Sequence, residues 1–500
     1  YLQEQDFLFI TLNLLVKQIK NMNIDNILKL KNKKILVIGL GKSGLSVINA
    51  LTKFDVYIRA IDTNISLNIQ DKINLPKKNT SSKLEILLGE KINKKSKILD
   101  SIDFVIVSPG VPSENLLLKR AEILQIPVLS EIELAWSLMN SNQKSNTVAV
   151  TGTNGKTTVV ALIDRMFKDC GINSIACGNI GNPLINTIED KRKDLLRVIE
   201  VSSFQLEKSY EFNPHVAIIL NITSDHLDRH KSMKKYAEAK FRLFQNATKK
   251  NLGIFNIDDS YCRKLLINKK FFSDKGLKII RYSLSRNKDS EIFYEKNKIF
   301  YNFAGLNGNI IIEKARLKGC HNILNMMAAA AAAKIFGIDD KNIEKTIKKF
   351  KPLEHRIEFV KQINGVKIYN DSKATNPDAT IKALESFEGE ISLILGGKDK
   401  NMDFTVLLSI MDKKVSNLFL IGETQIKILN MLKNHSKENS GRLPYDVFVC
   451  SSLEEAVKKG LKITKKGGIL LLSPACASFD MFKDYKDRGQ KFKGIILNKI

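Results

Sequence analysis

Short apolar runs alternate with stretches of helical periodicity along most of the chain. The first block contains three strand-like runs, at 33–41, 56–62 and 103–110, and each ends in glycine, aspartate or proline. Apolar runs that stop at turn-forming residues and are separated by amphipathic helices are typical of parallel sheets covered by helices. The pattern therefore predicts an α/β fold.

The same alternation restarts twice farther along the chain. A second block has strand-like runs that begin at Thr147, Arg197 and Val216, and it closes on an alanine-rich segment at 320–337. Alanine favours helix strongly, so this segment predicts a closely packed helix rather than a flexible linker. A third block adds five more runs, at 366–370, 391–395, 417–421, 447–450 and 467–472.

The length of the chain and these restarts predict three domains. At 500 residues the chain is too long for a single core. We expect domains at 22–129, 130–352 and 353–500. The chain begins with tyrosine, and Met22 stands just before the first strand, so we expect residues 1–21 to be an extension with no fold of their own.

The charge of the chain is strongly positive but dispersed. Lysine and arginine total 80 against 53 acidic residues, which gives a formal net charge of +27. The excess is mostly lysine spread along the chain, without a basic arm or a basic stripe interleaved with aromatics. This distribution favours a solvated surface over a nucleic-acid interface, so no nucleic-acid partner is expected. It also suits strongly anionic small substrates.

Cysteine usage and hydropathy indicate the compartment. The six cysteines show no paired CxxC spacing, which favours reduced thiols over a disulfide framework. No apolar run approaches the roughly 18 residues that a membrane helix needs. We therefore expect a cytoplasmic protein without membrane insertion.

A glycine-rich loop follows the first strand. Gly39, Gly41 and Gly44 form a G-x-G-x-x-G pattern, and Asp62 ends the next strand at about the spacing of a ribose-binding acid. Free N–H groups at the start of the following helix favour a diphosphate. The loop alone is consistent with NAD, and so with a dinucleotide-dependent oxidoreductase, or with another diphosphate ligand such as a nucleotide-sugar.

A second glycine loop, TGTNGKTT, follows the strand that begins at Thr147. It departs from the G-x-x-x-x-G-K-[ST] pattern only at Val150, which takes the place of the first glycine. In a strand, loop and helix of this kind, backbone N–H groups hold phosphates and Lys156 neutralises charge, while a hydroxyl of Thr157 or Thr158 reaches Mg²⁺. We predict an ATP site here.

Polar residues at two further strand ends extend this site. Glu200 ends the strand LLRVIEV and is placed like the acid that completes a Mg²⁺ site, or it is a solvated carboxylate. His226 lies in SDHLDRH with Asp225 and Asp228 nearby. His226 and His230 have the i, i+4 spacing of a zinc pair, but no third ligand supports zinc. A Mg²⁺ or substrate contact is the preferred interpretation.

Three strand ends of the third block also present polar or cationic groups. They are the segment 370–376 (NDSKATN), Lys398 with Lys400, and the segment 473–480 (SPACASFD). Open α/β sheets bind ligands at the carboxyl ends of their strands. Each turn alone is consistent with a solvated loop, whereas the three together favour a ligand that carries carboxylates.

In kind and order, the motifs of this chain resemble those of the Mur ligases, from about residue 30 onward. They are TGTNGKTT, EVSSFQL, NITSDHLDRH, the segment around Lys240, HNILN, HRIE, NDSKATN and LSPACASFD. The resemblance implies a Rossmann-like nucleotide-sugar domain, a central P-loop ATPase-like domain and a Rossmann-like amino-acid domain. It also implies an ATP-dependent amide ligase of peptidoglycan precursor synthesis, with two Mg²⁺ ions. NDSKATN and SPACASFD resemble most the members that add D-glutamate to UDP-N-acetylmuramoyl-L-alanine through an acyl phosphate.

The resemblance also implies site residues. For ATP they are Gly152, Thr153, Asn154, Gly155, Lys156, Thr157, Thr158, Asn322, Asn325, His355, Arg356, Asp371 and Lys373. For the UDP-linked substrate they are Gly41, Lys42, Ser43, Asp62, Thr63, Ser108, Pro109, Gly110 and Asn179. For D-glutamate they are Thr375, Lys400, Ser478 and Phe479. For metal they are Thr157, Thr158, Glu200, His226 and a carbamylated Lys240, and the implied catalytic residues are Lys156, His226 and Lys240.

Three other functions remain as alternatives. A Mur ligase for a different amino acid shares nearly every motif. An oxidoreductase would leave TGTNGKTT, HRIE and NDSKATN unused. A nucleic-acid-binding ATPase predicts basic charge clustered on one face. We expect a monomer whose ligands are small molecules.

Overall fold

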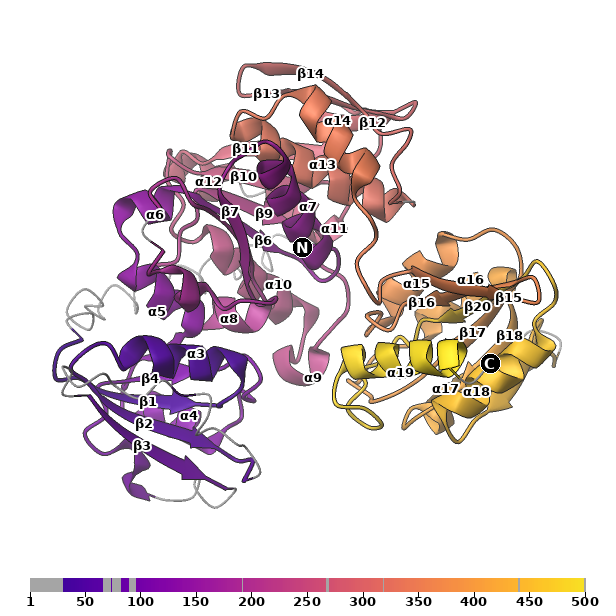
Figure 1. Ribbon diagram of the computed structural model, residues 1–500, viewed down its shortest axis with the longest axis horizontal. Helices are drawn as coiled ribbons and strands as arrows, with labels where there is room; N and C mark the ends of the chain where they lie inside the picture. Colours follow the sequence, from indigo (N-terminus) through magenta and orange to yellow (C-terminus); the bar gives the residue numbers. More distant parts are fainter. Residues whose placement is uncertain are drawn as a thin grey trace.

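The computed structural model contains three sheets, each with its own covering helices, which Figure 1 shows as three lobes of the molecule. The residues described are 30–65, 73, 82–89, 96–190, 192–266, 269–317, 319–438 and 441–498. The expected extension at 1–21 lies outside them. The predicted α/β class with three domains is confirmed, and the boundaries near 129 and 352 stay predictions.

The N-terminal sheet is wholly parallel, with the strand order β3-β2-β1-β4-β5. Its strands are β1 (Lys34–Ile38), β2 (Tyr57–Asp62), β3 (Lys83–Leu88), β4 (Phe104–Val107) and β5 (Val128–Ser130). The helices are α3 (Lys42–Leu51), η3 (Ser96–Leu99) and α4 (Leu116–Ile123). The three expected strands are present as β1, β2 and β4. The two additional strands are the edges of the sheet, where β3 is only partly buried and β5 has three residues.

The middle sheet has the order β14-β13-β12-β11-β10-β9-β6-β8-β7 and is parallel except at β12–β14. Its first five strands are β6 (Thr147–Thr151), β7 (Ser174–Gly178), β8 (Leu196–Glu200), β9 (Val216–Ile219) and β10 (Leu252–Asn256). The others are β11 (Lys278–Ser283), β12 (Ile292–Glu295), β13 (Lys298–Phe303) and β14 (Leu306–Ile311). The three expected strands are adjacent in the sheet, in the order β9-β6-β8.

Helices cover both faces of the middle sheet. In chain order, the first six are α5 (Glu131–Leu138), α6 (Ser141–Ser145), α7 (Lys156–Asp169), η4 (Leu184–Thr187), α8 (Ser203–Glu207) and α9 (Leu227–His230). The next six are α10 (Met233–Phe241), η5 (Arg242–Phe244), α11 (Ser260–Leu266), α12 (Lys269–Lys275), α13 (Cys320–Ile335) and α14 (Asp340–Lys349). Helix α13 is the predicted alanine-rich helix, and it packs against α7. The alanines at 328–333 are at most 2% exposed, so the close-packed interpretation is confirmed.

The C-terminal sheet has the order β15-β16-β20-β17-β18-β19, and only the β15–β16 pair is antiparallel. Its strands are β15 (Glu358–Ile363), β16 (Val366–Asn370), β17 (Ile391–Leu395), β18 (Val415–Leu420), β19 (Asp446–Val449) and β20 (Ile469–Leu472). The helices are α15 (Pro377–Glu385), η6 (Thr405–Leu407), α16 (Leu408–Lys414), α17 (Gln425–Glu438), α18 (Leu453–Ile463) and α19 (Tyr485–Asn498). All five expected strands are present.

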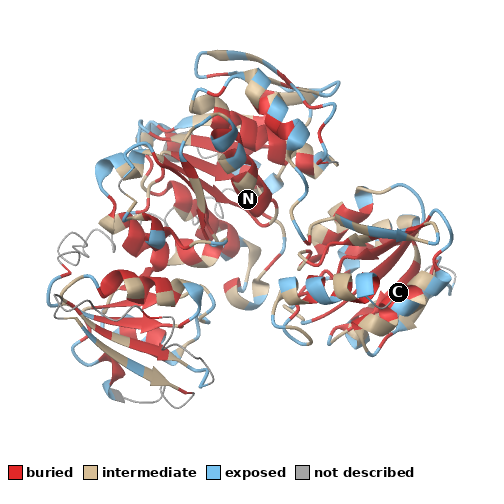
Figure 2. Cartoon of the chain, viewed as in Figure 1, coloured by how far each residue is buried: buried red, intermediate tan, exposed pale blue. Residues whose placement is uncertain are grey.

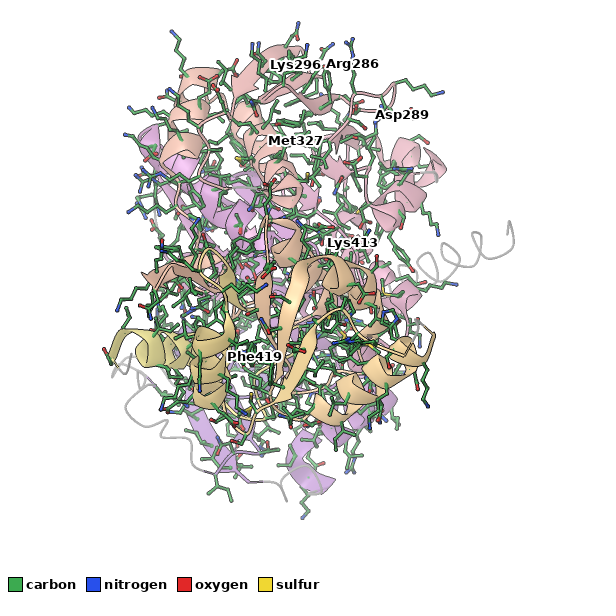
Figure 3. All side chains as sticks on the ribbon, turned by 90° about the vertical axis from the view of Figure 1, so that its right-hand side faces the viewer. Arg286, Asp289, Lys296, Met327, Lys413 and Phe419 are labelled. Carbon is green, nitrogen blue, oxygen red and sulfur yellow. The ribbon has the colours of Figure 1, made fainter. Side chains whose placement is uncertain are left out.

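Burial follows the apolar runs of the sequence. The central strands of all three sheets are buried, whereas the outer faces of the helices are exposed (Figure 2). Met327 and Phe419 are fully buried, whereas Arg286 and Lys296 of the middle lobe and Lys413 of the C-terminal lobe are exposed (Figure 3). None of the described helices combines the length and the apolar character needed to cross a lipid bilayer.

Candidate active site at the junction of three domains

The second glycine loop curls around its own lysine. It leaves the end of β6, and α7 begins at Lys156. Gly155 has φ of +89°, a conformation that favours glycine, and a Cβ added there would lie 2.4 Å from Asn325 Oδ1. Lys156 Nζ donates to the carbonyl oxygens of Gly152 (2.7 Å) and Thr153 (2.8 Å). The loop thus has the strand, turn and helix start that a phosphate cradle requires.

A second buried lysine lies against this loop. Lys240, from α10, is 1% exposed, and its Nζ donates to Gly152 O at 2.9 Å. The same Nζ lies 4.4 Å from the centroid of the Tyr236 ring. Burial lowers the pKa of Lys240 well below its ordinary value, and the charge of Lys156 adds to the shift. Burial therefore favours the neutral, nucleophilic form of this amine.

Two oxygen atoms beside the loop have no hydrogen-bond partner among the described residues. Glu200 ends β8, and its Oε1 accepts from Asn179 Nδ2 at 2.9 Å, but its Oε2 is buried and unpaired. Thr158 Oγ1, in the first turn of α7, is also buried and unpaired. Buried polar atoms normally find partners. Glu200 also lines the central cavity, and an unpaired carboxylate oxygen next to a phosphate loop is a ligand that suits Mg²⁺.

His226 stands at the start of α9 in a left-handed conformation, with φ of +53°. Burial lowers the pKa of its imidazole to about 3, so the ring is neutral and can donate a lone pair. His230 does not join it, because its ring contacts Ser203 Oγ at 2.9 Å and Glu207 Oε1 at 3.1 Å. The arrangement gives no support to a zinc pair.

The C-terminal domain reaches across to the middle domain at the same place. Lys373 Nζ donates to Thr157 Oγ1 at 2.6 Å, and Lys400 Nζ lies 2.5 Å from Asp225 Oδ1. Burial opposes the charge of Asp225, but Lys400 holds the pKa of this carboxyl below its ordinary value. Burial also lowers the pKa of Lys373 to about 7. Two predicted ligand contacts of the C-terminal domain are therefore paired with middle-domain side chains.

A central cavity of about 440 Å³ collects most of these groups from the two domains. The predicted residues that line it are Thr153, Asn154, Gly155, Lys156, Thr157, Asn179, Glu200, His226, Lys240, Arg356, Asp371, Lys373, Thr375, Lys400, Ser478 and Phe479. All four residues predicted to contact D-glutamate are among them. The cavity has an excess of cationic side chains, which favours anionic ligands.

A second cavity, of about 490 Å³, opens in the N-terminal domain. All nine residues predicted to contact the UDP-linked substrate line it: Gly41, Lys42, Ser43, Asp62, Thr63, Ser108, Pro109, Gly110 and Asn179. Asp62 accepts from the backbone N–H groups of Leu40 (2.6 Å) and Asn64 (2.9 Å). Asn179 lines both this cavity and the central one, so an elongated ligand can extend from one into the other.

A third cavity, of about 170 Å³, adjoins the central one at the phosphate loop, since Asn154 and Gly155 line both. It is lined by Asn325 and Arg356, together with Asn154 and Gly155 of the loop. A nucleotide whose phosphates lie on the loop can place its nucleoside here. Asn322 lies beside this cavity and accepts from Asn325 Nδ2 at 3.2 Å.

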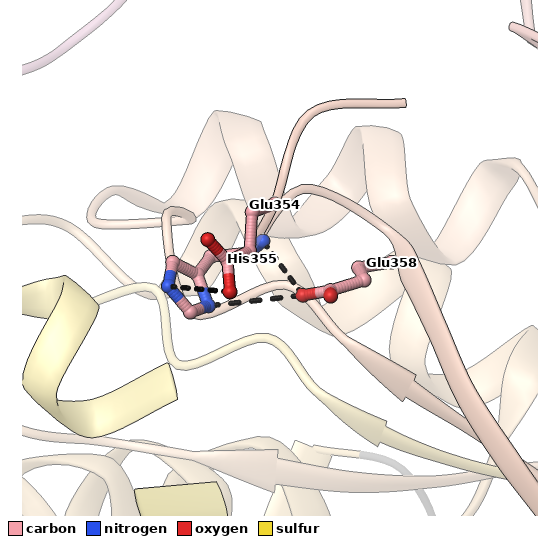
Figure 4. A group of neighbouring side chains, drawn as sticks. All are labelled: Glu354, His355 and Glu358. Atoms are coloured by element: carbon pink, nitrogen blue, oxygen red, sulfur yellow. Dashed lines mark hydrogen bonds and ion pairs between the residues drawn. The ribbon is translucent and has the colours of Figure 1, made fainter. Parts of the chain in front are cut away.

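Four predicted residues line none of these cavities: Gly152, Thr158, Asn322 and His355. Gly152 contributes only its carbonyl oxygen, and Thr158 lies buried behind the loop. His355 is buried in the C-terminal domain, where its Nδ1 is 2.9 Å from Asn370 Nδ2. Figure 4 shows His355 between two glutamates, a grouping with the spacing of a metal site. These glutamates are already paired with the ammonium of Lys493.

Several residues of the central cavity were not predicted. Asn376 Nδ2 donates to Asp225 Oδ2 at 2.9 Å, and both residues line the cavity. Asp378, which does not line it, accepts from Asn154 Nδ2 at 2.6 Å. Phe204 and Tyr236 also line the cavity. All four residues lie inside or beside motifs that the sequence did single out: Asp225 in SDHLDRH, Asn376 in NDSKATN, Phe204 in EVSSFQL and Tyr236 in the segment around Lys240. Position in the motif could therefore have identified them.

Comparisons with known proteins identify the family of the chain. Three profiles match the chain: "Mur ligase MurD-like, N-terminal domain" at 33–130, "Mur ligase middle domain" at 150–333 and "Mur ligase, glutamate ligase domain" at 355–476. The chain belongs to the Mur ligase family.

Its relatives include two enzymes named UDP-N-acetylmuramoylalanine--D-glutamate ligase. The enzyme of Caldicellulosiruptor saccharolyticus is 41% identical over 92% of this chain and 98% of its own length. That of Caldanaerobacter subterraneus subsp. tengcongensis is 38% identical over 94% and 99%. A similar solved structure, the UDP-N-acetylmuramate-alanine ligase of Thermotoga maritima, has a TM-score of 0.55 at 18% identity and covers 93% of this chain and 100% of its own. This last similarity concerns the fold.

Proposed function

We propose that the chain is an ATP-dependent ligase that joins D-glutamate to UDP-N-acetylmuramoyl-L-alanine in the cytoplasm, in peptidoglycan precursor synthesis. The observation that carries the proposal is the junction of the substrate cavity, the phosphate loop and the amino-acid contacts at one centre. The names of the relatives support the choice of substrate. We also propose that the protein acts as a monomer.

The chemistry requires activation of a carboxylate. The L-alanine carboxylate attacks the γ-phosphorus of ATP, which forms an acyl phosphate and releases ADP. Two anions must approach each other in this step, and Lys156, Arg356 and Lys373 supply positive charge around the central cavity. The neutral amine of D-glutamate then attacks the acyl carbon, the amide forms, and inorganic phosphate and a proton leave.

The D-glutamate side is formed by the C-terminal domain. Lys400 offers an ammonium to a substrate carboxylate, and Asp225 holds that ammonium in the cavity. Thr375 and Ser478 add hydroxyl groups on the same lining. His226, neutral because of its lowered pKa, can accept a hydrogen bond from the attacking amine or hold a metal ion.

Mg²⁺ fits the unpaired carboxylate oxygen described above. Glu200, Thr157 and His226 line the central cavity and are the residues that would hold it, whereas Thr158 lies behind the loop. Bound Mg²⁺ would neutralise phosphate charge and polarise the phosphoryl group. Lys240 would contribute after its neutral amine reacts with CO₂, which forms a carbamate, releases a proton and adds a carboxylate to the site.

Phosphate release from ATP tests the proposal. The enzyme would be assayed with UDP-N-acetylmuramoyl-L-alanine, Mg²⁺ and bicarbonate against D-glutamate, L-glutamate, L-lysine and meso-diaminopimelate. We expect release only with D-glutamate, together with a new amide product. Release with another amino acid would show that the proposed amino-acid substrate is wrong, while the proposed ligase reaction would stand. Absence of release with all four would contradict the proposed function.

A further inference from the structure

Arg229 connects the N-terminal domain to the centre of the molecule. It belongs to α9, which Figure 1 shows projecting from the middle domain into the space between the other two domains. Its Nη1 donates to the carbonyl oxygen of Pro109 at 2.7 Å. Pro109 lines the N-terminal cavity in which we propose that the uridine nucleotide binds. The turn at 108–110 is therefore attached to the middle domain through one guanidinium group.

The same guanidinium lies over a side chain of the central cavity. The Cζ atom of Arg229 is 3.8 Å from the centroid of the Phe204 ring, and Phe204 lines that cavity. The Phe204 ring in turn meets the His226 imidazole edge to face, with 4.9 Å between ring centroids. Arg229 Nη2 also pairs with Glu207 Oε2 at 3.5 Å. A single planar group thus touches both the substrate turn and the wall next to His226.

Helix α9 needs such an anchor. It has only four residues, and a non-glycine residue in a left-handed conformation bounds it at each end: His226 with φ of +53° and Lys231 with φ of +64°. Strained conformations of this kind persist only where surrounding contacts hold them. Side chains of α9 supply these contacts, His230 to Ser203 and Glu207, and Arg229 to Pro109 and Phe204.

Stability alone does not explain the arrangement. The side chain of Arg229 is 15% exposed, and its Nε is buried with no hydrogen-bond partner among the described residues. A buried unpaired donor opposes folding. Lysine could pair with Glu207 or reach Pro109, but only a planar guanidinium can donate at its edge while its face covers an aromatic ring.

We propose that Arg229 is a positioning residue that sets the separation between the uridine end and the acyl end of the substrate. The inference rests on the proposed function, because it needs one ligand that spans the N-terminal and central cavities. With the turn at 108–110 fixed to α9, a nucleotide held in the first cavity presents its far carboxylate at a fixed distance from His226 and Glu200. Loss of Arg229 would leave nucleotide binding intact and misplace the reacting carboxylate.

The test compares Arg229→Lys and Arg229→Met with matched substitutions of Arg242. Arg242 is a suitable control because it also donates to backbone carbonyls, of Leu206 and Ser209, and lies over an aromatic ring, that of Tyr210, but it does so within the middle domain. Three quantities would be measured for each variant: the affinity for UDP alone, kcat/KM for UDP-N-acetylmuramoyl-L-alanine, and Tm.

For both Arg229 variants we expect UDP affinity within about twofold of wild type. We expect kcat/KM to fall about 100-fold in Arg229→Met, as for a misplaced reacting group, with partial recovery on addition of methylguanidinium. The Arg242 variants should lose Tm without this selective fall. If kcat/KM of the Arg229 variants stays within about threefold of the Arg242 variants, or if UDP affinity falls equally, the positioning role is wrong.

Failure of the proposed function would be seen separately, in the wild-type enzyme. If wild type turns over with an amino acid other than D-glutamate, the same comparison is made with that amino acid. If no amino acid supports turnover, the test uses binding alone, as the ratio of affinities for UDP-N-acetylmuramoyl-L-alanine and for UDP. A ratio that falls only in the Arg229 variants supports positioning, and an unchanged ratio overturns it.

Discussion

The two glycine loops of this molecule look alike in sequence and differ in their surroundings. Each follows a buried parallel strand and opens a helix, α3 in the N-terminal domain and α7 in the middle domain. The first loop is held by neutral and acidic partners: Ser108 Oγ donates to Gly39 O, and Asp62 accepts from Leu40 N. Its one lysine, Lys42, is exposed. The second loop encloses Lys156 and is backed by the buried Lys240.

This difference separates binding from chemistry. Backbone N–H groups at a helix start hold a diphosphate in either loop. Transfer of a phosphoryl group also needs fixed positive charge in a site that excludes water, because the charge of the transition state must be stabilised without reorganisation. Only the second loop has that charge. We therefore expect matched substitutions in the two loops to have very different effects.

The largest difference should come from the lysines. Lys156→Met removes a fixed cation from the phosphate loop and should lower kcat by about 1,000-fold, measured by phosphate release. Lys42→Met, on the exposed loop, should leave kcat nearly unchanged and raise KM for the UDP-linked substrate only slightly. Equal losses of kcat in the two variants would contradict the separation of roles.

The glycines provide a second matched pair. Gly155→Ala places a Cβ 2.4 Å from Asn325 Oδ1 at a φ of +89°, so the loop must shift and ATP affinity should fall about 100-fold. Gly41→Ala has no atom within 4 Å of the added Cβ and should be tolerated. Calorimetric titration measures the affinity of Gly155→Ala for ATP and the affinity of Gly41→Ala for UDP. Normal ATP binding by Gly155→Ala would show that the loop adapts.

Metal dependence distinguishes the loops further. Glu200→Gln removes the charge of the unpaired carboxylate beside the second loop, and we expect it to raise the Mg²⁺ concentration for half-maximal activity roughly 30-fold. A Mg²⁺ titration of kcat measures this shift. Saturating Mg²⁺ should restore most of the activity. If the Mg²⁺ dependence of Glu200→Gln is the same as that of wild type, Glu200 does not bind the metal.

The smallest effect concerns the first loop. Asp62→Asn weakens the charged acceptor of the Leu40 and Asn64 N–H groups without changing its shape, so affinity for UDP should fall about fivefold. Binding of ATP should stay the same. A fall in kcat at saturating substrate would mean that the first loop takes part in the chemistry after all.

The sequence predicted what is local. Apolar runs that end in glycine or aspartate identified the central strands, and TGTNGKTT identified the start of α7, because both depend on neighbours along the chain. Lys240 has no such signature among 80 basic residues. Its importance comes from burial against Gly152, a residue 88 positions away, and only the resemblance to a family indicated it.

Contacts between domains could not be predicted from the sequence either, because they also join residues that are far apart along the chain. The pairs Lys400–Asp225 and Asp378–Asn154 join residues of the C-terminal and middle domains. Hydrophobic periodicity carries no information on how two separately folded sheets face each other. The strands β12–β14, at one end of the middle sheet, were missed because partly exposed hairpin strands lack the continuous apolar runs of a buried parallel strand.

The alanine-rich seam between α13 and α7 limits how this enzyme can move. The alanine side chains of α13 allow its backbone to approach α7 closely, and the larger apolar side chains of α7 are fully buried in the same cluster, so a displacement of either helix would disturb close packing. The phosphate loop at the head of α7 is therefore a stationary reference point. We therefore expect the motion that admits ligands and releases product to be a movement of the N-terminal and C-terminal domains relative to the middle domain.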